Sequence, residues 1–189
     1  MSQITKKALA GAFRELLEEK PISKITISDI TDRAGVNRHT FYYHFKDIND
    51  MIAWTFSTKI KELLDEHICY DNWQNAFGVL LDYCSQRRKF ILAVYHSDSK
   101  EHVLRLFNEW VYTLLRRVLE EQSIGMHVYD SDKDYIARFY QFGFVGMLIS
   151  WLDTGMMEDP EVLIKQLAIL ARGDLKDTLI RFEEETMRK

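Results

Sequence analysis

Apolar residues recur with helical spacing along most of the chain. Between Thr5 and Lys20 they fall three and four positions apart, on one helix face, at Ala8, Leu9, Ala12, Phe13, Leu16 and Leu17. Pro21 follows and cannot continue a helix, so the pattern predicts a first helix that stops there. The only other proline is Pro160, and β-branched clusters are few. The sequence therefore predicts an all-α protein.

Two short helices joined by a tight turn are predicted next. Thr26 or Ser28 can cap a helix whose inner face holds Ile27, Ile30 and Ala34. Gly35 suits the end of that helix because glycine adopts positive φ without steric cost. Asn37 can then cap a third helix over residues 38–45.

The third helix has one packing face and one projecting face. Phe41 and Phe45 lie four residues apart on the same face, whereas His39 and Tyr43 lie nearly opposite. The apolar pattern resumes at Ile48 and continues towards residue 67, with no flexible linker. A long fourth helix is therefore expected to follow the third directly.

The remaining pattern predicts more helices. A turn is expected at 69–72, followed by helices over 73–85, 89–95 and 100–122 and a loop over 123–132. Two closing helices are expected over 133–153 and 160–184, with Gly173 as a candidate break in the second. No internal repeat or low-complexity tract separates these segments.

Composition and charge indicate a globular cytoplasmic protein. Apolar residues make up 47% of the chain, and its net charge is −4. Residues 1–50 carry eight Lys or Arg against seven Asp or Glu, so the acidic excess lies further along. The start of the chain lacks a signal-peptide core, and the longest uncharged apolar run, Phe142–Leu152, is shorter than the ~20 residues of a membrane span. Cys69 and Cys84 fit reduced cytosolic thiols better than a disulfide or metal site.

The segment from Ile25 to Lys46 resembles the DNA-binding helix-turn-helix of the tetracycline-repressor (TetR/AcrR) family. It has the apolar-Thr start, Ala-Gly-Val at the turn, and Thr-Phe-Tyr-x-x-Phe in the third helix. The resemblance covers about Thr5 to Ile52. It implies a homeodomain-like DNA-binding domain over 1–50, joined by a long helix to a helical effector-binding and dimerisation domain over 51–189.

The projecting face of the third helix carries the candidate DNA contacts. Arg38 can donate two hydrogen bonds to guanine O6 and N7, and His39 or Tyr42 can contact bases or a thymine methyl group. Other residues match positions that the resemblance assigns to contacts with phosphate or the groove wall, or lie at the start of the supporting helix. They should position the protein on the DNA rather than select its base sequence. These are Thr26, Ser28, Thr40, Tyr43, His44 and Lys46. The alternatives are packing for Tyr42, Tyr43 and His44, and a solvated charge for Arg38.

One position departs from the family pattern. Family members often carry a phosphate-binding Lys at the start of the fourth helix, where this chain has Ile48. Lys46 or helix N-terminal amides could replace that contact.

A homodimer is expected on two grounds. The run Phe142–Leu152 is apolar almost all round, which predicts burial, and Gly143, Gly146 and Ser150 would let another helix approach closely. Two-fold symmetry suits a palindromic operator, whose half-sites need recognition helices about 34–36 Å apart. The expected interface combines these small residues with Leu163, Leu167 and Leu170; the alternative is an ordinary monomer core.

Aromatic residues could line a small-molecule effector pocket, as the family resemblance implies. The candidates are Trp54, Trp73, Phe77, Tyr83, Phe107, Trp110 and Phe139, although simple core packing is the competing interpretation. The stretch from Phe41 to Phe56 is similar to the branch of the family that includes dihydroxyacetone kinase regulators. Effector identity and the choice between repressor and activator stay open.

Two other classes of protein have an all-α fold but need different sequence features. A carboxylate-bridged metal enzyme in a helical bundle needs Glu-x-x-His pairs, and none of the six histidines has Glu three residues before it. Phosphate loops, zinc-ligand clusters and nucleophile elbows are also missing, so no enzyme activity, cofactor or metal is expected. The second alternative is a helical partner-binding adaptor that has lost strong DNA affinity, which Ile48 slightly favours.

Overall fold

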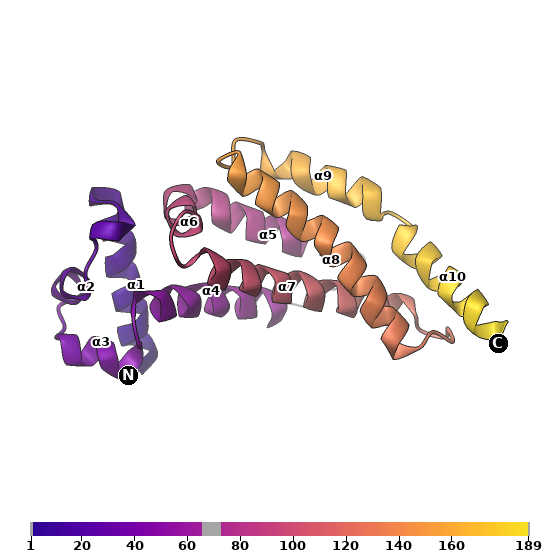
Figure 1. Cartoon of the computed structure of the whole chain (residues 1–189), viewed down its shortest axis with the longest axis horizontal. Helices are drawn as coiled ribbons and strands as arrows, with labels where there is room; N and C mark the ends of the chain where they lie inside the picture. The colour runs from indigo at the N-terminus through magenta and orange to yellow at the C-terminus, as the bar shows by residue number, and fades with distance from the viewer. Residues whose placement is uncertain (1, 66–72, 189) are drawn as a thin grey trace. The chain divides into compact units, whose positions relative to one another are not determined.

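A computed structural model describes residues 2–65 and 73–188. All the regular secondary structure in these ranges is helical (Figure 1). The all-α prediction is confirmed. Helices α1 to α10 and one 3-10 turn, η1, occur in this order: α1 Ser2–Glu19, η1 Ile22–Lys24, α2 Ile27–Ala34, α3 Arg38–His44, α4 Ile48–Asp65, α5 Trp73–Gln86, α6 Arg88–Tyr95, α7 Lys100–Gln122, α8 Asp130–Asp153, α9 Pro160–Ala171 and α10 Asp174–Met187.

The helices form two compact units. The first unit contains residues up to 61 together with 87–106, and the second contains 62–86 and 107–189. The first unit thus includes α1 to α3, most of α4, α6 and the start of α7. The division into a DNA-binding domain over 1–50 and an effector-binding and dimerisation domain over 51–189 follows from the family resemblance and stays a prediction.

The first unit is built on α1, which contacts α2, α3 and α6. Its apolar stripe is buried as the periodicity predicts, with Leu9 and Phe13 almost inaccessible to solvent. Phe90 of α6 packs edge-on against Phe13, with ring centres 6.2 Å apart, and stacks on Phe56 of α4 at 5.6 Å. Helix α6 is therefore fixed to both α1 and α4.

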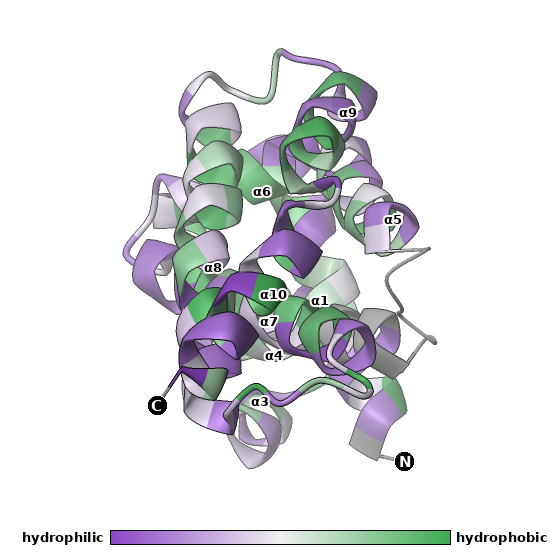
Figure 2. Ribbon diagram, turned by 90° about the vertical axis from the view of Figure 1, so that its right-hand side faces the viewer, coloured by the Kyte–Doolittle hydropathy of each residue, from purple (hydrophilic) through white to green (hydrophobic). Residues whose placement is uncertain are grey.

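In the second unit, α5 packs against α9. A Cβ added at Gly78 of α5 would lie 3.2 Å from Ile164 Cδ1, so glycine permits this close approach. Gly173 has φ 79° and separates α9 from α10, which confirms the predicted break. Figure 2 shows that α9 is the more hydrophobic of these two helices.

The described residues also bear on the predictions about cysteines, membrane spans and metal sites. Cys84 is buried, whereas Cys69 and the end of the predicted fourth helix at His67 lie outside the described residues. Among the helices in the described ranges, none combines the length and hydrophobicity that crossing a membrane requires. Nor does this part of the chain bring three or more His, Cys, Asp or Glu side chains together as a metal site would.

Candidate nucleic-acid interface

The start of α2 is fixed by a capping box. The Thr26 hydroxyl accepts a hydrogen bond from Asp29 N at 3.2 Å, and Thr26 N donates to Asp29 Oδ2 at 2.7 Å. Lys20 Nζ lies 2.8 Å from the same carboxylate oxygen. The hydrogen bond from Lys20, followed by those from Thr26, holds the pKa of the Asp29 carboxyl well below its ordinary value. Thr26, and not Ser28, is therefore the cap of α2.

The turn between α2 and α3 has the predicted conformation. Gly35 adopts φ 68°, and the next amide, Val36 N, donates to Thr31 O at 2.9 Å, which ends α2. Asn37 Oδ1 then accepts hydrogen bonds from Thr40 N at 2.8 Å and from the Thr40 hydroxyl at 3.0 Å. Local hydrogen bonds thus set the angle at which α3 leaves α2.

Helix α3 is anchored by its inner aromatic residues. Phe41 and Phe45 are 0% and 2% exposed, with ring centres 5.8 Å apart. Phe45 also packs against Trp54 of α4 at 5.6 Å. The ammonium of Lys6 lies 5.1 Å from the centre of the Phe45 ring, which adds a cation–π contact from α1. Because α1 and α4 both contact Phe45, α3 is held rigidly from behind.

The opposite side of α3 projects into solvent. Tyr43 is 83% exposed and Tyr42 is 52% exposed, while Arg38 and His39 are also exposed. Arg38 Nη2 lies 3.5 Å from the Tyr42 hydroxyl, at the long limit of a hydrogen bond. His44 is half-buried, and its ring centre lies 5.0 Å from that of Tyr43. The exposures of Tyr42 and Tyr43 disfavour the packing alternative for both.

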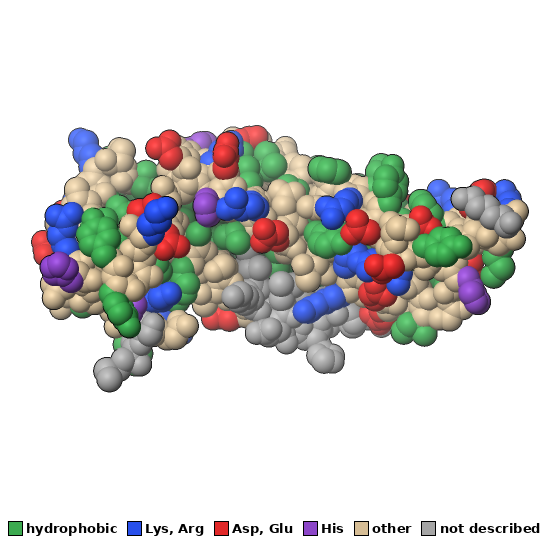
Figure 3. Space-filling view, turned by 60° about the horizontal axis from the view of Figure 1, so that its bottom comes forward, with side chains coloured by type: hydrophobic (Ala, Val, Ile, Leu, Met, Phe, Trp, Pro, Cys, Tyr) green, Lys and Arg blue, Asp and Glu red, His purple; other side chains and the backbone are tan. Residues whose placement is uncertain are grey.

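The other predicted contact residues have partners of their own. Ser28 is half-buried, and its carbonyl accepts a hydrogen bond from the Thr31 hydroxyl. Lys46 has an exposed side chain, whereas its backbone N donates to Asp50 Oδ2 at 2.9 Å. Arg33, a nearby cation, is bound to Glu19 through Nη2 at 2.8 and 2.9 Å. On the face drawn in Figure 3, Lys, Arg and His side chains lie among acidic ones in the first unit.

Some of the predicted effector-pocket residues lie together in the second unit. Trp73, Phe77, Phe107 and Trp110 are buried, and the ring centres of Phe77 and Trp110 are 5.7 Å apart. Sequence reasoning missed Phe144, whose ring centre lies 5.4 Å from that of Trp73 and 5.6 Å from that of Phe77. The run Phe142–Leu152 of its helix, α8, is apolar on all sides, so periodicity does not reveal which residues of this run point inward.

Two other predicted pocket residues do not join this buried cluster. Trp54 belongs to the first unit, where it lies on α4 and packs on Phe45, the residue that follows α3. Phe139 is 67% exposed, and Tyr83 is only half-buried. Within the cluster, Trp110 Nε1 is buried, and no acceptor among the described residues lies within hydrogen-bond reach.

The predicted dimer residues divide into two groups. Gly143, Gly146 and Ser150 are exposed, and nothing described lies within 4 Å of a Cβ added at either glycine. Leu170 is 70% exposed. Leu163 and Leu167, in contrast, are 1% and 3% exposed, because they lie on the inward side of α9, so the expectation that they face a partner is corrected.

The exposed group borders an apolar groove between α8 and α9. Its volume is about 560 Å³, and Phe139, Phe142, Met147 and Leu170 line it. Phe142 is 73% exposed, although the all-round apolar character of α8 predicted burial. The outer side of α8 is therefore apolar and uncovered within a single chain.

The capped α2, the glycine turn and the projecting α3 together define a helix-turn-helix DNA-binding protein. A family model described as bacterial regulatory proteins, tetR family, matches residues 9–53. A second model, described as a transcriptional regulator C-terminal region, matches residues 71–173. The chain belongs to the TetR family of bacterial transcription regulators, which bind DNA, and the resemblance predicted from sequence is confirmed.

Similar proteins include both an activator and a repressor. The HTH-type dhaKLM operon transcriptional activator DhaS of Lactococcus lactis is 30% identical over 141 residues, 73% of this chain and 74% of that protein. The probable acrEF/envCD operon repressor of Escherichia coli K12 is 27% identical over 178 residues, 80% of this chain and 81% of that protein.

Two solved structures show the same fold. The dihydroxyacetone kinase operon activator DhaS superimposes with a TM-score of 0.74 at 26% identity, covering 95% of this chain and 98% of that one. The repressor NalD of Pseudomonas aeruginosa has a TM-score of 0.54 at 16% identity, covering 95% and 96%, and shows the fold alone.

Proposed function

We propose that the chain reads a palindromic operator as a homodimer, with the projecting face of α3 in the major groove. The observation that carries this proposal is the contrast between buried Phe41 and Phe45 and the exposed side chains opposite them. In this arrangement Arg38, His39 and Tyr42 read base edges. Residues that touch the phosphate backbone set the register: Thr26, Ser28, Thr40, Tyr43, His44 and Lys46.

The proposed dimer forms through the outer side of α8 and α9. Phe139, Phe142 and Leu170 are each at least 67% exposed, and such a concentration of exposed apolar side chains is typical of an interaction surface. A two-fold axis would place each patch against its copy, so the aromatic side chains of one chain reach the groove of the other. Gly143 and Gly146 would allow the two α8 helices to approach closely.

The proposed effector binds in the second unit beside Trp110. A buried indole N–H without an acceptor costs about 1–3 kcal/mol, which an effector oxygen would recover. The aromatic cluster of Trp73, Phe77 and Phe144 favours a ligand with an apolar or aromatic body. Compounds of this kind that stabilise the protein in a thermal-shift screen should stop doing so in Trp110→Phe, while operator affinity persists.

Selection of bound duplexes from a random pool tests the DNA-binding proposal. We expect two symmetric half-sites about one helical turn, roughly 34–36 Å, apart, and affinity that falls as salt rises. Mobility shifts with selected and scrambled duplexes then separate specific from non-specific binding. Absence of any salt-sensitive DNA affinity would contradict the proposal and favour the partner-binding adaptor instead.

A further inference from the structure

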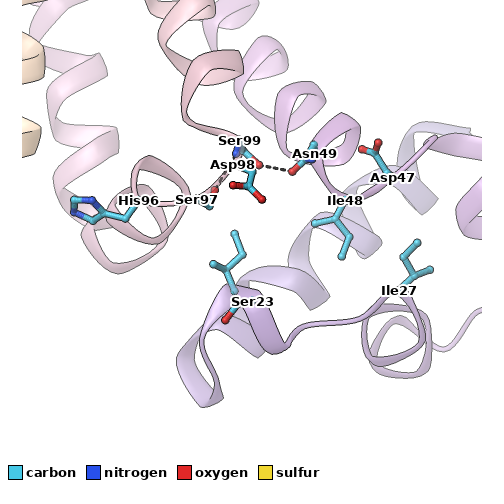
Figure 4. Close-up of a pocket in the computed structure, with 10 residues that line it drawn as sticks. Ser23, Ile27, Asp47, Ile48, Asn49, His96, Ser97, Asp98 and Ser99 are labelled. Carbon is cyan, nitrogen blue, oxygen red and sulfur yellow. Dashed lines mark hydrogen bonds between the residues drawn. The ribbon is translucent and has the colours of Figure 1, made fainter.

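The first turn of α4 offers the DNA backbone no positive charge. Figure 4 shows Ile48 and Asp98 facing a common groove of about 590 Å³, and none of the described residues that line it is Lys or Arg. Asp50 N donates to Asp47 Oδ1 at 2.8 Å, so a carboxylate already caps the start of this helix. Apart from Lys46, a cation that meets phosphate beside the end of α3 must therefore come from another helix.

Lys6 of α1 brings an ammonium group to the end of α3. Its Nζ lies 5.1 Å from the centre of the Phe45 ring and 5.5 Å from that of the Trp54 ring. Figure 1 shows the start of α1 beside the end of α3, where Phe45 follows His44. The two rings lie 5.6 Å apart, so the ammonium is held against a pair of aromatic side chains.

The ammonium of Lys6 is positioned but not neutralised. It forms no ion pair with any carboxylate of the described residues. Other cations of the first unit contact carboxylates, at 2.8 Å for Lys20 and Asp29, 2.8 Å for Arg33 and Glu19, and 2.6 Å for Lys89 and Glu18. An aromatic ring attracts a cation without cancelling its charge, and a Lys ammonium carries three N–H donors. Lys6 therefore keeps both charge and donors for an anion.

We propose that Lys6 binds a phosphate of the DNA backbone, next to the phosphate contacts proposed for Tyr43 and His44. The inference rests on the proposed DNA binding. The ring centre of Phe45 lies 6.5 Å from that of His44, which lies 5.0 Å from that of Tyr43, so a row of rings joins the ammonium to the projecting side of α3. A phosphate beside this row meets charge from α1 and side chains from α3 together. Because the rings hold the ammonium before DNA arrives, binding loses less side-chain entropy.

Lys6→Met tests the inference, because methionine keeps a flexible apolar side chain against the rings and removes the charge. Lys7→Met is the matched control: it removes the same charge one residue away, where the side chain is exposed and contacts no ring of the described residues. Lys6→Arg keeps the charge, and Lys6→Gln is a second neutral variant. Affinity of the full-length variants for the selected and scrambled duplexes is measured over a salt titration, and thermal unfolding checks that each variant is folded.

We expect Lys6→Met and Lys6→Gln to weaken binding to both duplexes by the same factor, and to lower the slope of log affinity against log salt by about one. A fourfold rise in salt should then cost the wild type about 3.5 times more affinity than it costs these variants. Lys6→Arg and Lys7→Met should keep the wild-type slope.

An unchanged slope in both neutral variants of Lys6, with or without a loss of thermal stability, would overturn the inference and leave Lys6 as a packing contact between helices. Equal changes of slope in Lys6→Met and Lys7→Met would also overturn it, because they would report only the net charge of the protein. Failure of the wild-type chain to bind either duplex would instead reject the proposed function.

Discussion

Truncating Phe142 to alanine should separate the proposed dimer while each chain stays folded. A phenylalanine offers about 200 Å² of surface, and Phe142 is 73% exposed, so its ring has about 150 Å² available to a partner. Burial of that area is worth about 3–4 kcal/mol at ~25 cal/mol per Å². Ordering costs at an interface reduce the realised value, and about 2 kcal/mol is typical for a hot-spot side chain.

Each substitution enters a two-fold dimer twice. The expected loss is therefore about 4 kcal/mol, or about a thousandfold in the dimer Kd. Sedimentation velocity over a dilution series measures this Kd. Ile124→Ala is the control, because Ile124 is 80% exposed but lies between α7 and α8, outside the α8–α9 groove.

Gly146→Leu supplies a second test, because it should raise the stability of the monomer and lower the affinity of the dimer. Nothing described lies within 4 Å of a Cβ at Gly146, and leucine is the better helix former, so the monomer should become slightly more stable. The same side chain should block close approach of a second α8 and weaken the dimer. A dimer Kd within threefold of wild type for both Phe142→Ala and Gly146→Leu would refute the proposed interface.

Three further predictions concern the first unit. Asp29 has a lowered pKa, so its contribution to stability is complete above its ordinary pKa of about 4 and is lost as pH falls towards the lowered value. Urea unfolding between pH 2 and 6 should therefore show a free energy of unfolding that depends less on pH in Asp29→Asn than in the wild type. Arg38→Ala should cost about 1–3 kcal/mol in binding to the selected duplex and much less on scrambled DNA, and an equal loss on both would reassign Arg38 to phosphate. Ile48→Lys should tighten binding to any duplex and steepen the salt dependence by about one phosphate contact, whereas an unchanged slope in a salt titration would reject that role.

Short-range chemistry made the DNA-binding helices predictable from sequence. The Thr26 cap, the positive φ of Gly35 and the Asn37 cap each depend on residues within a few positions, so the helix boundaries follow from local rules. The spacing of Phe41 and Phe45 likewise identifies the buried side of α3 and, by exclusion, the projecting side. Ser28 as an alternative cap was eliminated only by the hydrogen bonds seen at Thr26.

In the second unit, periodicity identified the helices but not their faces. The second half of α8 carries apolar residues all round, so the sequence could not show that Phe144 points inward and Phe142 outward. On α9, Leu163 and Leu167 are as apolar as Leu170, yet only Leu170 is exposed, because packing against α5 selects one side.

The sequence by itself thus determined an all-α chain, a helix-turn-helix and its projecting residues, because these follow from contacts within one or two helical turns. Only the tertiary structure separated Trp54 from the buried aromatic cluster and brought Ser99 against Asn49, fifty residues away. That hydrogen bond joins the link between α6 and α7 to the start of α4. A pattern along one helix carries no information about which distant segment will pack against it, so such sites emerge only when the chain folds.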